Sequence, residues 1–156
     1  MNKVGAQYYT VRDFCGDLNG FSETLKKVAD IGYKNVQISG TCPYEAEWLK
    51  EELKKNGLKC VLTHIPNDDL IGSTEKVIEN HNVFDCKYVG LGYYDIISNP
   101  QENYQKFVDT YKEVAKKLYE GGKYFMYHNH DHEFIKIDGK TISERMVEDV
   151  PAEHMG

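Results

Sequence analysis

Arginine is scarce in this sequence, and acidic residues outnumber basic ones. Arg12 and Arg145 are its two arginines, and 25 aspartates and glutamates stand against 19 lysines and arginines, which gives a formal net charge of −6. Nucleic-acid and anionic-membrane binders rely on a positive surface field, and phosphate is usually recognised through the bidentate arginine fork. The composition therefore argues against both kinds of partner, and an anion site would have to use lysine, backbone N–H groups or Arg12.

Long apolar runs and closely spaced cysteines are also lacking. No apolar stretch approaches the roughly 20 residues that a transmembrane helix requires, and the first residues lack the apolar core of a signal peptide. The four cysteines form no C-x-x-C pair and are predicted to be free thiols that serve mainly as small apolar side chains: Cys15, Cys42, Cys60 and Cys86. We expect a cytoplasmic protein, and 156 residues that are 40% apolar predict a single domain spanning residues 1–156.

What the sequence does contain is a repeating unit. Four short apolar stretches each begin with a lysine-bearing segment that starts with glycine or aspartate. These segments are GYKNV at 32–36, GLKCV at 57–61, DCKYV at 85–89 and, more loosely, GKYF at 122–125. Each of them follows a segment with helical spacing of apolar residues, and this alternation is typical of β/α units around a parallel sheet. The predicted strands are residues 4–11, 35–39, 59–65, 88–93 and 124–128, and the predicted helices lie around 21–29, 46–53, 69–80 and 104–118, with a last one starting near Thr141.

Two architectures could hold such units. A doubly wound sheet usually carries a glycine-rich phosphate loop after its first strand, and the loop TVRDFCG at 10–16 lacks that fingerprint. A (β/α)₈ barrel instead gathers its chemistry at the carboxyl ends of the strands, and polar or aromatic residues recur there: Tyr9, Arg12, Gln37, Thr63, His64, Tyr93, Tyr94, Asp95 and the segment 127–134. We therefore predict an α/β, TIM-barrel-like (β/α)₈ fold that is incomplete, with about five β/α units, because a whole barrel typically takes about 250 residues.

The segment YHNHDHEF at 127–134 holds half of the six histidines together with two carboxylates. In an extended strand, His128 and His130 would project to one face, so that one pocket would receive two imidazoles, whereas His132 is expected to face solvent. For these side chains the alternative role is structural, with the imidazoles capping the sheet and Glu133 forming a loop salt bridge. His64 could likewise be a satisfied buried histidine instead of an acid–base group.

Three stretches, YTVR at 9–12, THI at 63–65 and above all YHNHDHEF, resemble the sugar phosphate isomerase/epimerase family of xylose-isomerase-like TIM barrels, which includes inosose dehydratases, ketose 3-epimerases and endonuclease IV. The resemblance implies isomerisation or epimerisation of a sugar or sugar phosphate by proton transfer through an enediolate. It also implies one divalent metal, manganese before magnesium, zinc or cobalt, held by a glutamate, an aspartate, a histidine and a glutamate from the fifth to eighth units. Within this chain, Glu133 fits the first of these ligands, with His128 and His130 competing for the role. Because the other three would fall beyond Gly156, the chain as it stands is expected to be inactive.

The resulting prediction assigns roles to eight residues. Catalytic roles are predicted for His128, His130 and His64, substrate binding for Arg12, Tyr9, Gln37 and Tyr93, and metal binding for Glu133. Two alternatives stay open: a non-catalytic barrel fragment that self-associates, and an endonuclease IV-like phosphodiester hydrolase. Exposed edges on the first and fifth strands would recruit partner strands, so we expect a homo-oligomer.

Overall fold

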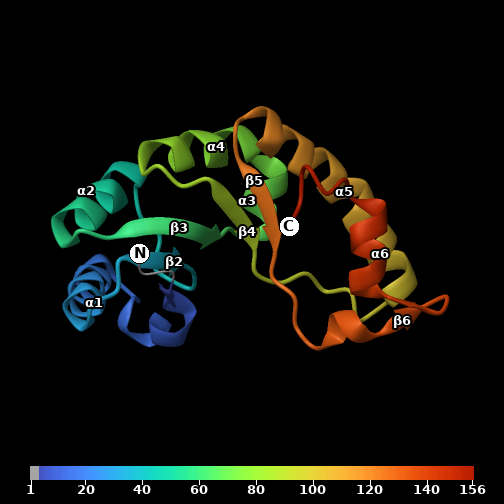
Figure 1. Cartoon of the computed structure of the whole chain (residues 1–156), viewed down its shortest axis with the longest axis horizontal. Helices are drawn as coiled ribbons and strands as arrows, with labels where there is room; N and C mark the ends of the chain where they lie inside the picture. The colour runs from blue at the N-terminus through green and yellow to red at the C-terminus, as the bar shows by residue number, and fades with distance from the viewer. Residues whose placement is uncertain (1–3) are drawn as a thin grey trace. The chain divides into compact units, whose positions relative to one another are not determined.

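A computed structural model describes residues 4–156 and shows the predicted alternation of strands and helices (Figure 1). The elements in chain order are β1 Gly5–Gln7, the 3₁₀ helix η1 Tyr8–Phe14, α1 Leu18–Ile31, β2 Asn35–Ile38, α2 Ala46–Asn56, β3 Lys59–His64, α3 Asn67–Gly72, α4 Thr74–Val83, β4 Tyr88–Leu91, α5 Pro100–Glu120, β5 Tyr124–Tyr127, the 3₁₀ helix η2 His132–Phe134, β6 Lys136–Ile137, β7 Lys140–Thr141 and α6 Ile142–Asp149. Among these described residues, no helix is both long enough and apolar enough to cross a membrane.

Strand order separates the two architectures that the sequence left open. The main sheet runs β1-β2-β3-β4-β5, in the order of the chain, and the pairs β1–β2 and β2–β3 are parallel. A doubly wound sheet reverses its strand order at a switch point, whereas the strands of a (β/α)₈ barrel follow one another around it. The observed order is therefore that of a barrel.

The first predicted strand is much shorter than expected. The extended backbone ends at Gln7, and the 3₁₀ helix η1 replaces residues 8–11 of the prediction. Local hydrogen bonds explain the change, since the Thr10 hydroxyl donates to the Gln7 carbonyl at 2.7 Å and the Arg12 guanidinium donates to the Tyr9 carbonyl at 2.6 Å. Such side-chain to backbone bonds offer the chain an alternative to the strand ladder.

The single helix predicted for residues 69–80 is in fact two helices. α3 ends at Gly72 and α4 begins at Thr74, with Ser73 between them in a non-helical conformation (φ −145°, ψ 37°). Glycine has a low helix propensity, and the Thr74 hydroxyl donates to the Leu70 carbonyl at 2.5 Å. These two features divide the segment, although each half keeps the apolar contacts that suggested a helix.

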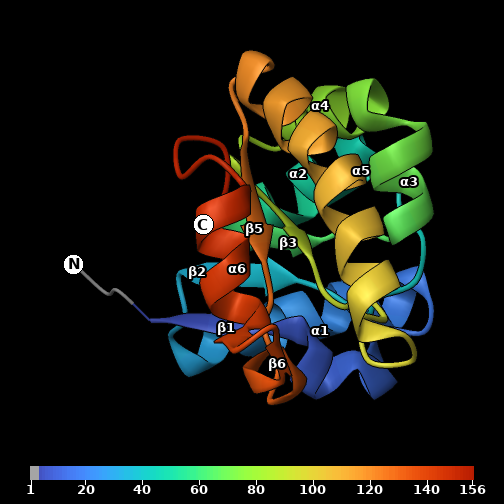
Figure 2. The ribbon, with the colours of Figure 1, turned by 90° about the vertical axis from the view of Figure 1, so that its right-hand side faces the viewer.

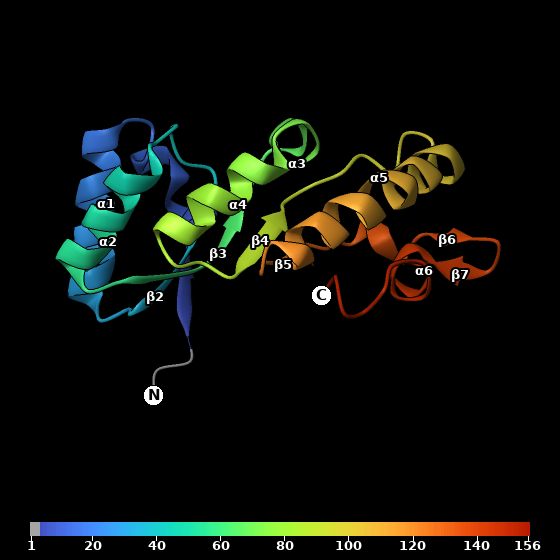
Figure 3. The same cartoon turned by 90° about the horizontal axis from the view of Figure 1, so that it is seen from above.

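Contacts divide the chain into two compact units, of which the first contains the residues up to His64 together with Glu79–Val89. Its helices α1 and α2 pack on each other (Figure 3), and each ends at a glycine in the left-handed conformation, Gly32 at φ 111° and Gly57 at φ 62°. The fully buried core includes Phe21, Leu25 and Val36. The apolar spacing that predicted these two helices is the spacing of the core residues themselves.

The second unit contains Ile65–Ile78 and Gly90–Gly156. Its longest helix, α5, buries the predicted apolar stripe, which comprises Tyr104, Phe107, Val108, Tyr111, Val114, Ala115 and Leu118. The Tyr111 ring stacks on the ring of Phe125 in β5, with centroids 5.1 Å apart, and Phe107 meets the Tyr127 ring edge-on at 5.3 Å. The aromatic face of α5 therefore holds β5 and fixes the residue at its carboxyl end, Tyr127.

The end of the chain contains a hairpin turn and a capped helix. Asp138 and Gly139 both have positive φ, as a two-residue hairpin turn requires, and they join β6 to β7; α6 lies beside α5 (Figure 2). Thr141, near which the last helix was predicted to start, forms a capping box with Glu144 at the beginning of α6. The fifth strand was predicted to have an exposed edge, but residues 154–156 form backbone hydrogen bonds with Phe125 and Tyr127 of β5.

Candidate active site

In the first unit, the structure joins two predicted site residues directly. The Gln37 side-chain amide lies 2.7 Å from Nε2 of His64, the last residue of β3. A register shift between Val36 and Gln37 accompanies this contact, because β3 carries one more residue than β2 at this point. The bulge brings the two polar side chains together at the carboxyl ends of their strands.

Arg12 and Tyr9 form a second pair in this unit, on η1. The guanidinium carbon of Arg12 lies 4.2 Å from the centre of the Tyr9 ring, in a cation–π contact, while the same side chain bonds the Tyr9 carbonyl. Gly40 follows β2 with a positive φ of 68°, and a Cβ atom there would lie 2.9 Å from the Tyr9 ring. Close approach of this ring therefore requires a glycine at position 40.

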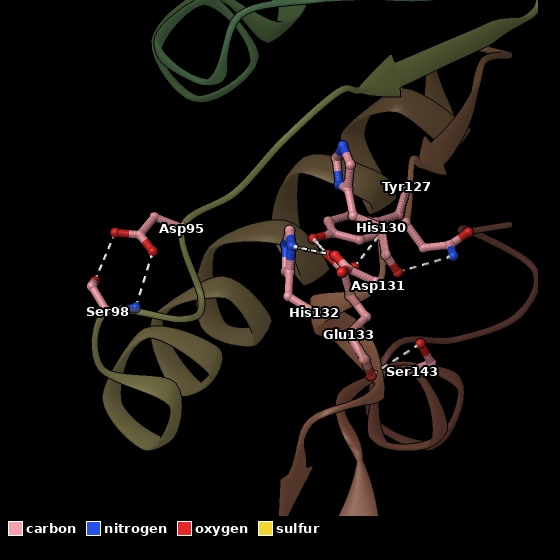
Figure 4. Close-up of polar contacts among 9 residues, drawn as sticks. Asp95, Ser98, Tyr127, His130, Asp131, His132, Glu133 and Ser143 are labelled. Carbon is pink, nitrogen blue, oxygen red and sulfur yellow. Dashed lines mark hydrogen bonds and ion pairs between the residues drawn. The ribbon is translucent and has the colours of Figure 1, made fainter.

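In the second unit, β5 ends in the histidine-rich segment (Figure 4). The Glu133 side chain is completely buried, and its carboxylate accepts hydrogen bonds from the Tyr127 hydroxyl and from the His130 backbone N–H, both at 2.6 Å. Burial, followed by the bond to Glu133, raises the pKa of Tyr127 far above its usual range. The phenol therefore keeps its proton and remains a donor to the carboxylate.

Three imidazoles gather around this carboxylate. The rings of His128 and His130 lie 5.0 Å apart, edge to face, so the prediction that they share one side is confirmed. His132 stacks on His130 with centroids 5.1 Å apart and planes 12° apart, and its side chain is only 11% exposed, so the prediction that it faces solvent is wrong. The short 3₁₀ helix η2 causes this, because it turns the chain back after Asp131.

The nitrogen atoms of this cluster are unusually placed. Nε2 of His132 lies 2.9 Å from a Glu133 oxygen without hydrogen-bond geometry, and that atom and Nδ1 of His130 are both buried without a hydrogen-bond partner. Burial, then the neighbouring His130, lowers the pKa of His128, which favours its neutral form. One ligand atom from each of His130, His132 and Glu133 lies within 4.8 Å of the other two.

Tyr93 connects the cluster to a neighbouring hollow. Its ring meets His130 and His132 edge-on, with centroids 5.9 and 5.7 Å apart. The hollow has a volume of about 340 Å³ and is lined by Asn67, Tyr93, Tyr94, Asp95 and Asn103. Ser98 donates through its hydroxyl and its backbone N–H to the Asp95 carboxylate, which lowers the pKa of Asp95 and keeps it anionic (Figure 4).

Two members of the site were missed by the sequence reasoning. Tyr127 opens the quoted segment, but nothing in its neighbourhood along the chain marks it as the donor to Glu133. His132 was predicted to face solvent. Its spacing of two residues from His130 was the signal that could have included it.

Comparisons with known proteins bear on the fold. No family model matches the chain, and no curated protein matches it. A solved structure of a sugar phosphate isomerase/epimerase from Parabacteroides distasonis matches 97% of this chain and 63% of its own, with 16% identity and a TM-score of 0.79. A probable 3-DHS dehydratase, AsbF, from Bacillus anthracis matches 99% of this chain and 61% of its own, at 13% identity and a TM-score of 0.70. A D-psicose 3-epimerase, solved in the presence of D-fructose, matches 97% of this chain and 61% of its own, at 15% identity and a TM-score of 0.65.

This likeness confirms the predicted fold. The chain spans 61 to 63% of the length of these three structures, so it has the fold of part of a TIM barrel. The resemblance inferred from the sequence therefore holds at the level of architecture.

Proposed function

We propose that this chain, with the fold of part of a xylose-isomerase-like TIM barrel, is a metal-dependent isomerase or epimerase of a sugar or sugar phosphate. The observation that carries the proposal is the buried Glu133 carboxylate, surrounded by imidazole nitrogens at the carboxyl end of β5. In barrels of this kind, chemistry gathers at that end of the strands. The chain's own groups match the two requirements of the reaction, a cation site and a proton acceptor.

The donor set near Glu133 fits a divalent metal. Its carboxylate and the unpartnered nitrogens of His130 and His132 offer the oxygen and nitrogen ligands that such ions take. When bound, the ion would supply positive charge to substrate oxygens and so stabilise the negative charge that develops when a neighbouring C–H is deprotonated. Tyr127 and the His130 backbone N–H hold the carboxylate in place, as outer-shell partners do in metal sites.

Proton transfer is proposed for His128. Its ring lies beside His130, and burial favours its neutral form, which is the form that accepts a proton. His130 was predicted as a second acid–base group, but it is one of the three candidate metal ligands. We therefore assign proton transfer to His128 ahead of His130.

Substrate hydroxyl groups are proposed to bind in the hollow beside Tyr93. Its lining combines two tyrosines, two asparagines and the anionic Asp95, which can bind hydroxyls through hydrogen bonds and aromatic faces. In the first unit, the paired Gln37 and His64 and the paired Arg12 and Tyr9 keep their predicted substrate and acid–base roles as proposals.

The proposal can be tested by hydrogen exchange in D₂O. Ketoses, ketose phosphates and inososes are incubated with the purified chain and a divalent metal, and deuterium at the carbon next to the carbonyl is followed by NMR. Exchange that disappears in Glu133→Gln and survives in Glu153→Gln, an exposed control, supports the proposal. Absence of exchange on every substrate, with metal bound, contradicts it.

The other expectations stay predictions. The expected inactivity of the chain as it stands is the rival outcome of the same assay, since a blank result would support it and contradict the proposal. No contact among residues 4–156 favours non-catalytic self-association or endonuclease IV-like hydrolysis. The expected homo-oligomer was argued from an exposed edge on the fifth strand, and the pairing of residues 154–156 with β5 weakens that argument.

A further inference from the structure

The buried carboxylate of Glu133 lacks a permanently charged partner among the described residues. Its two hydrogen bonds come from neutral groups, the Tyr127 hydroxyl and the His130 backbone N–H. Within residues 4–156, its ion-pair contact is with His132, and no lysine or arginine joins it. Burying a carboxylate away from water is costly unless a positive charge compensates. The surroundings of Glu133 therefore call for a cation.

The nitrogens beside this carboxylate are equally incomplete. Nδ1 of His130 and Nε2 of His132 are buried and accept or donate no hydrogen bond. Leaving a buried polar atom unpaired is destabilising, and here two such atoms occur next to a buried carboxylate. One nitrogen from each of the two rings and one oxygen of Glu133 lie within 4.8 Å of one another in one short segment.

We infer that His130, His132 and Glu133 together bind one divalent ion, as a two-histidine, one-carboxylate set that favours Zn²⁺ or Co²⁺ over Mn²⁺ and Mg²⁺. Two imidazoles and a carboxylate are a ligand set of catalytic zinc sites, which keep a further position for water or substrate. Magnesium and manganese prefer sites made of oxygen ligands. The inference rests on the proposed function only for the role of the metal, because binding itself needs no substrate.

This site differs from the one that the resemblance implies. There, the fifth unit supplies a single glutamate and manganese is foremost; here, one segment of the second unit supplies three ligands. The surrounding contacts suit such a site, since the edge-on Tyr93 ring braces both imidazoles and Tyr127 fixes the carboxylate. Because these contacts fix the orientation of the ligand side chains, less free energy is needed to arrange the side chains around an ion.

The test is a titration of the metal-stripped chain with Zn²⁺, Co²⁺, Mn²⁺ and Mg²⁺, followed by calorimetry and by the visible absorption of Co²⁺. We expect one equivalent of Zn²⁺ to bind at least 100-fold more tightly than Mn²⁺, and Co²⁺ to show ligand-field bands. His132→Ala should weaken Zn²⁺ binding by at least 10-fold and Mn²⁺ binding less, while His154→Ala, a histidine outside the cluster, should leave both unchanged. Circular dichroism confirms that each variant is folded.

The opposite results overturn the inference. These are Mn²⁺ or Mg²⁺ binding as tightly as Zn²⁺, or His132→Ala binding Zn²⁺ like the unaltered chain. Because no substrate is present, a chain that binds zinc as expected but exchanges no sugar hydrogen contradicts the proposed function alone. A chain that exchanges sugar hydrogen while His132→Ala keeps its zinc affinity contradicts this inference alone.

Discussion

The two compact units differ in how their candidate site residues are paired. In the first unit, the predicted site residues are paired with each other: Gln37 with His64, and Arg12 with the ring and carbonyl of Tyr9. In the second unit, His130 and His132 each have a buried nitrogen without a hydrogen-bond partner, and both residues lie close to the buried Glu133 carboxylate. Buried polar groups in proteins are nearly always satisfied, so the paired groups are suited to orientation and the unpaired ones to a ligand.

The largest effect is expected from removing the charge of Glu133. Glu133→Gln keeps the shape of the side chain but removes the anion that would hold the metal. Because a bound metal contributes several kcal/mol to such a reaction, we expect sugar hydrogen exchange to fall by about 1000-fold or more. The rate of deuterium incorporation measures this effect. A loss of less than 10-fold would contradict the assignment of the metal site to the second unit.

A smaller effect is expected from Tyr127→Phe. The variant keeps the ring that packs on Phe107 and removes the hydroxyl that donates to Glu133. Loss of an outer-shell partner typically lowers metal affinity by about 10–100-fold, which calorimetry can measure. Tyr104→Phe, which removes a comparable bond to Asp149 in the same unit, is the matched control and should leave the affinity unchanged.

In the first unit, Gln37→Ala should act differently. The His64 ring loses a partner at 2.7 Å, so we expect a decrease of about 1 kcal/mol in the free energy of unfolding, measured in urea. Zn²⁺ affinity should not change. An affinity loss as large as that of Tyr127→Phe would show that the pairs in this unit belong to the metal site.

The smallest effect concerns a cap outside the site. Thr141→Ala removes the hydroxyl that caps α6 and should cost about 1 kcal/mol of stability at neutral pH, with metal affinity unchanged. Hydrogen bonds from the Thr141 backbone N–H and then from its hydroxyl lower the pKa of Glu144 in the folded state, and the variant loses only the bond from the hydroxyl. This contribution is therefore present above the unfolded pKa of about 4.3 and is lost as the pH falls through the folded value. Unfolding at pH 7 and pH 3 checks this, and the two proteins should differ less at pH 3.

Much of the fold could be predicted because local pattern and tertiary packing agree. The stripe on α5, the glycines after α1 and α2, and the Thr141 capping box are each determined within a few residues. The failures arose where local hydrogen bonds compete with the pattern. Thr10 and Arg12 bond the backbone of η1 and shorten the first strand, and Thr74 bonds back to Leu70 where α3 and α4 separate.

The candidate site was predicted in part. Clustering of residue types identified His128, His130 and Glu133, and strand-end positions identified Gln37, His64 and Tyr93. The bond from Tyr127 could not be predicted, because it joins the end of β5 to Glu133 in the turn that η2 makes. Alternation along a strand carries no information about such a turn.

The most direct test of the account is a crystal structure of the chain grown with Zn²⁺, with anomalous scattering recorded at the zinc edge. The account predicts one strong anomalous peak within bonding distance of His130, His132 and Glu133. A map with no peak there, or with zinc bound only at other residues, would contradict it.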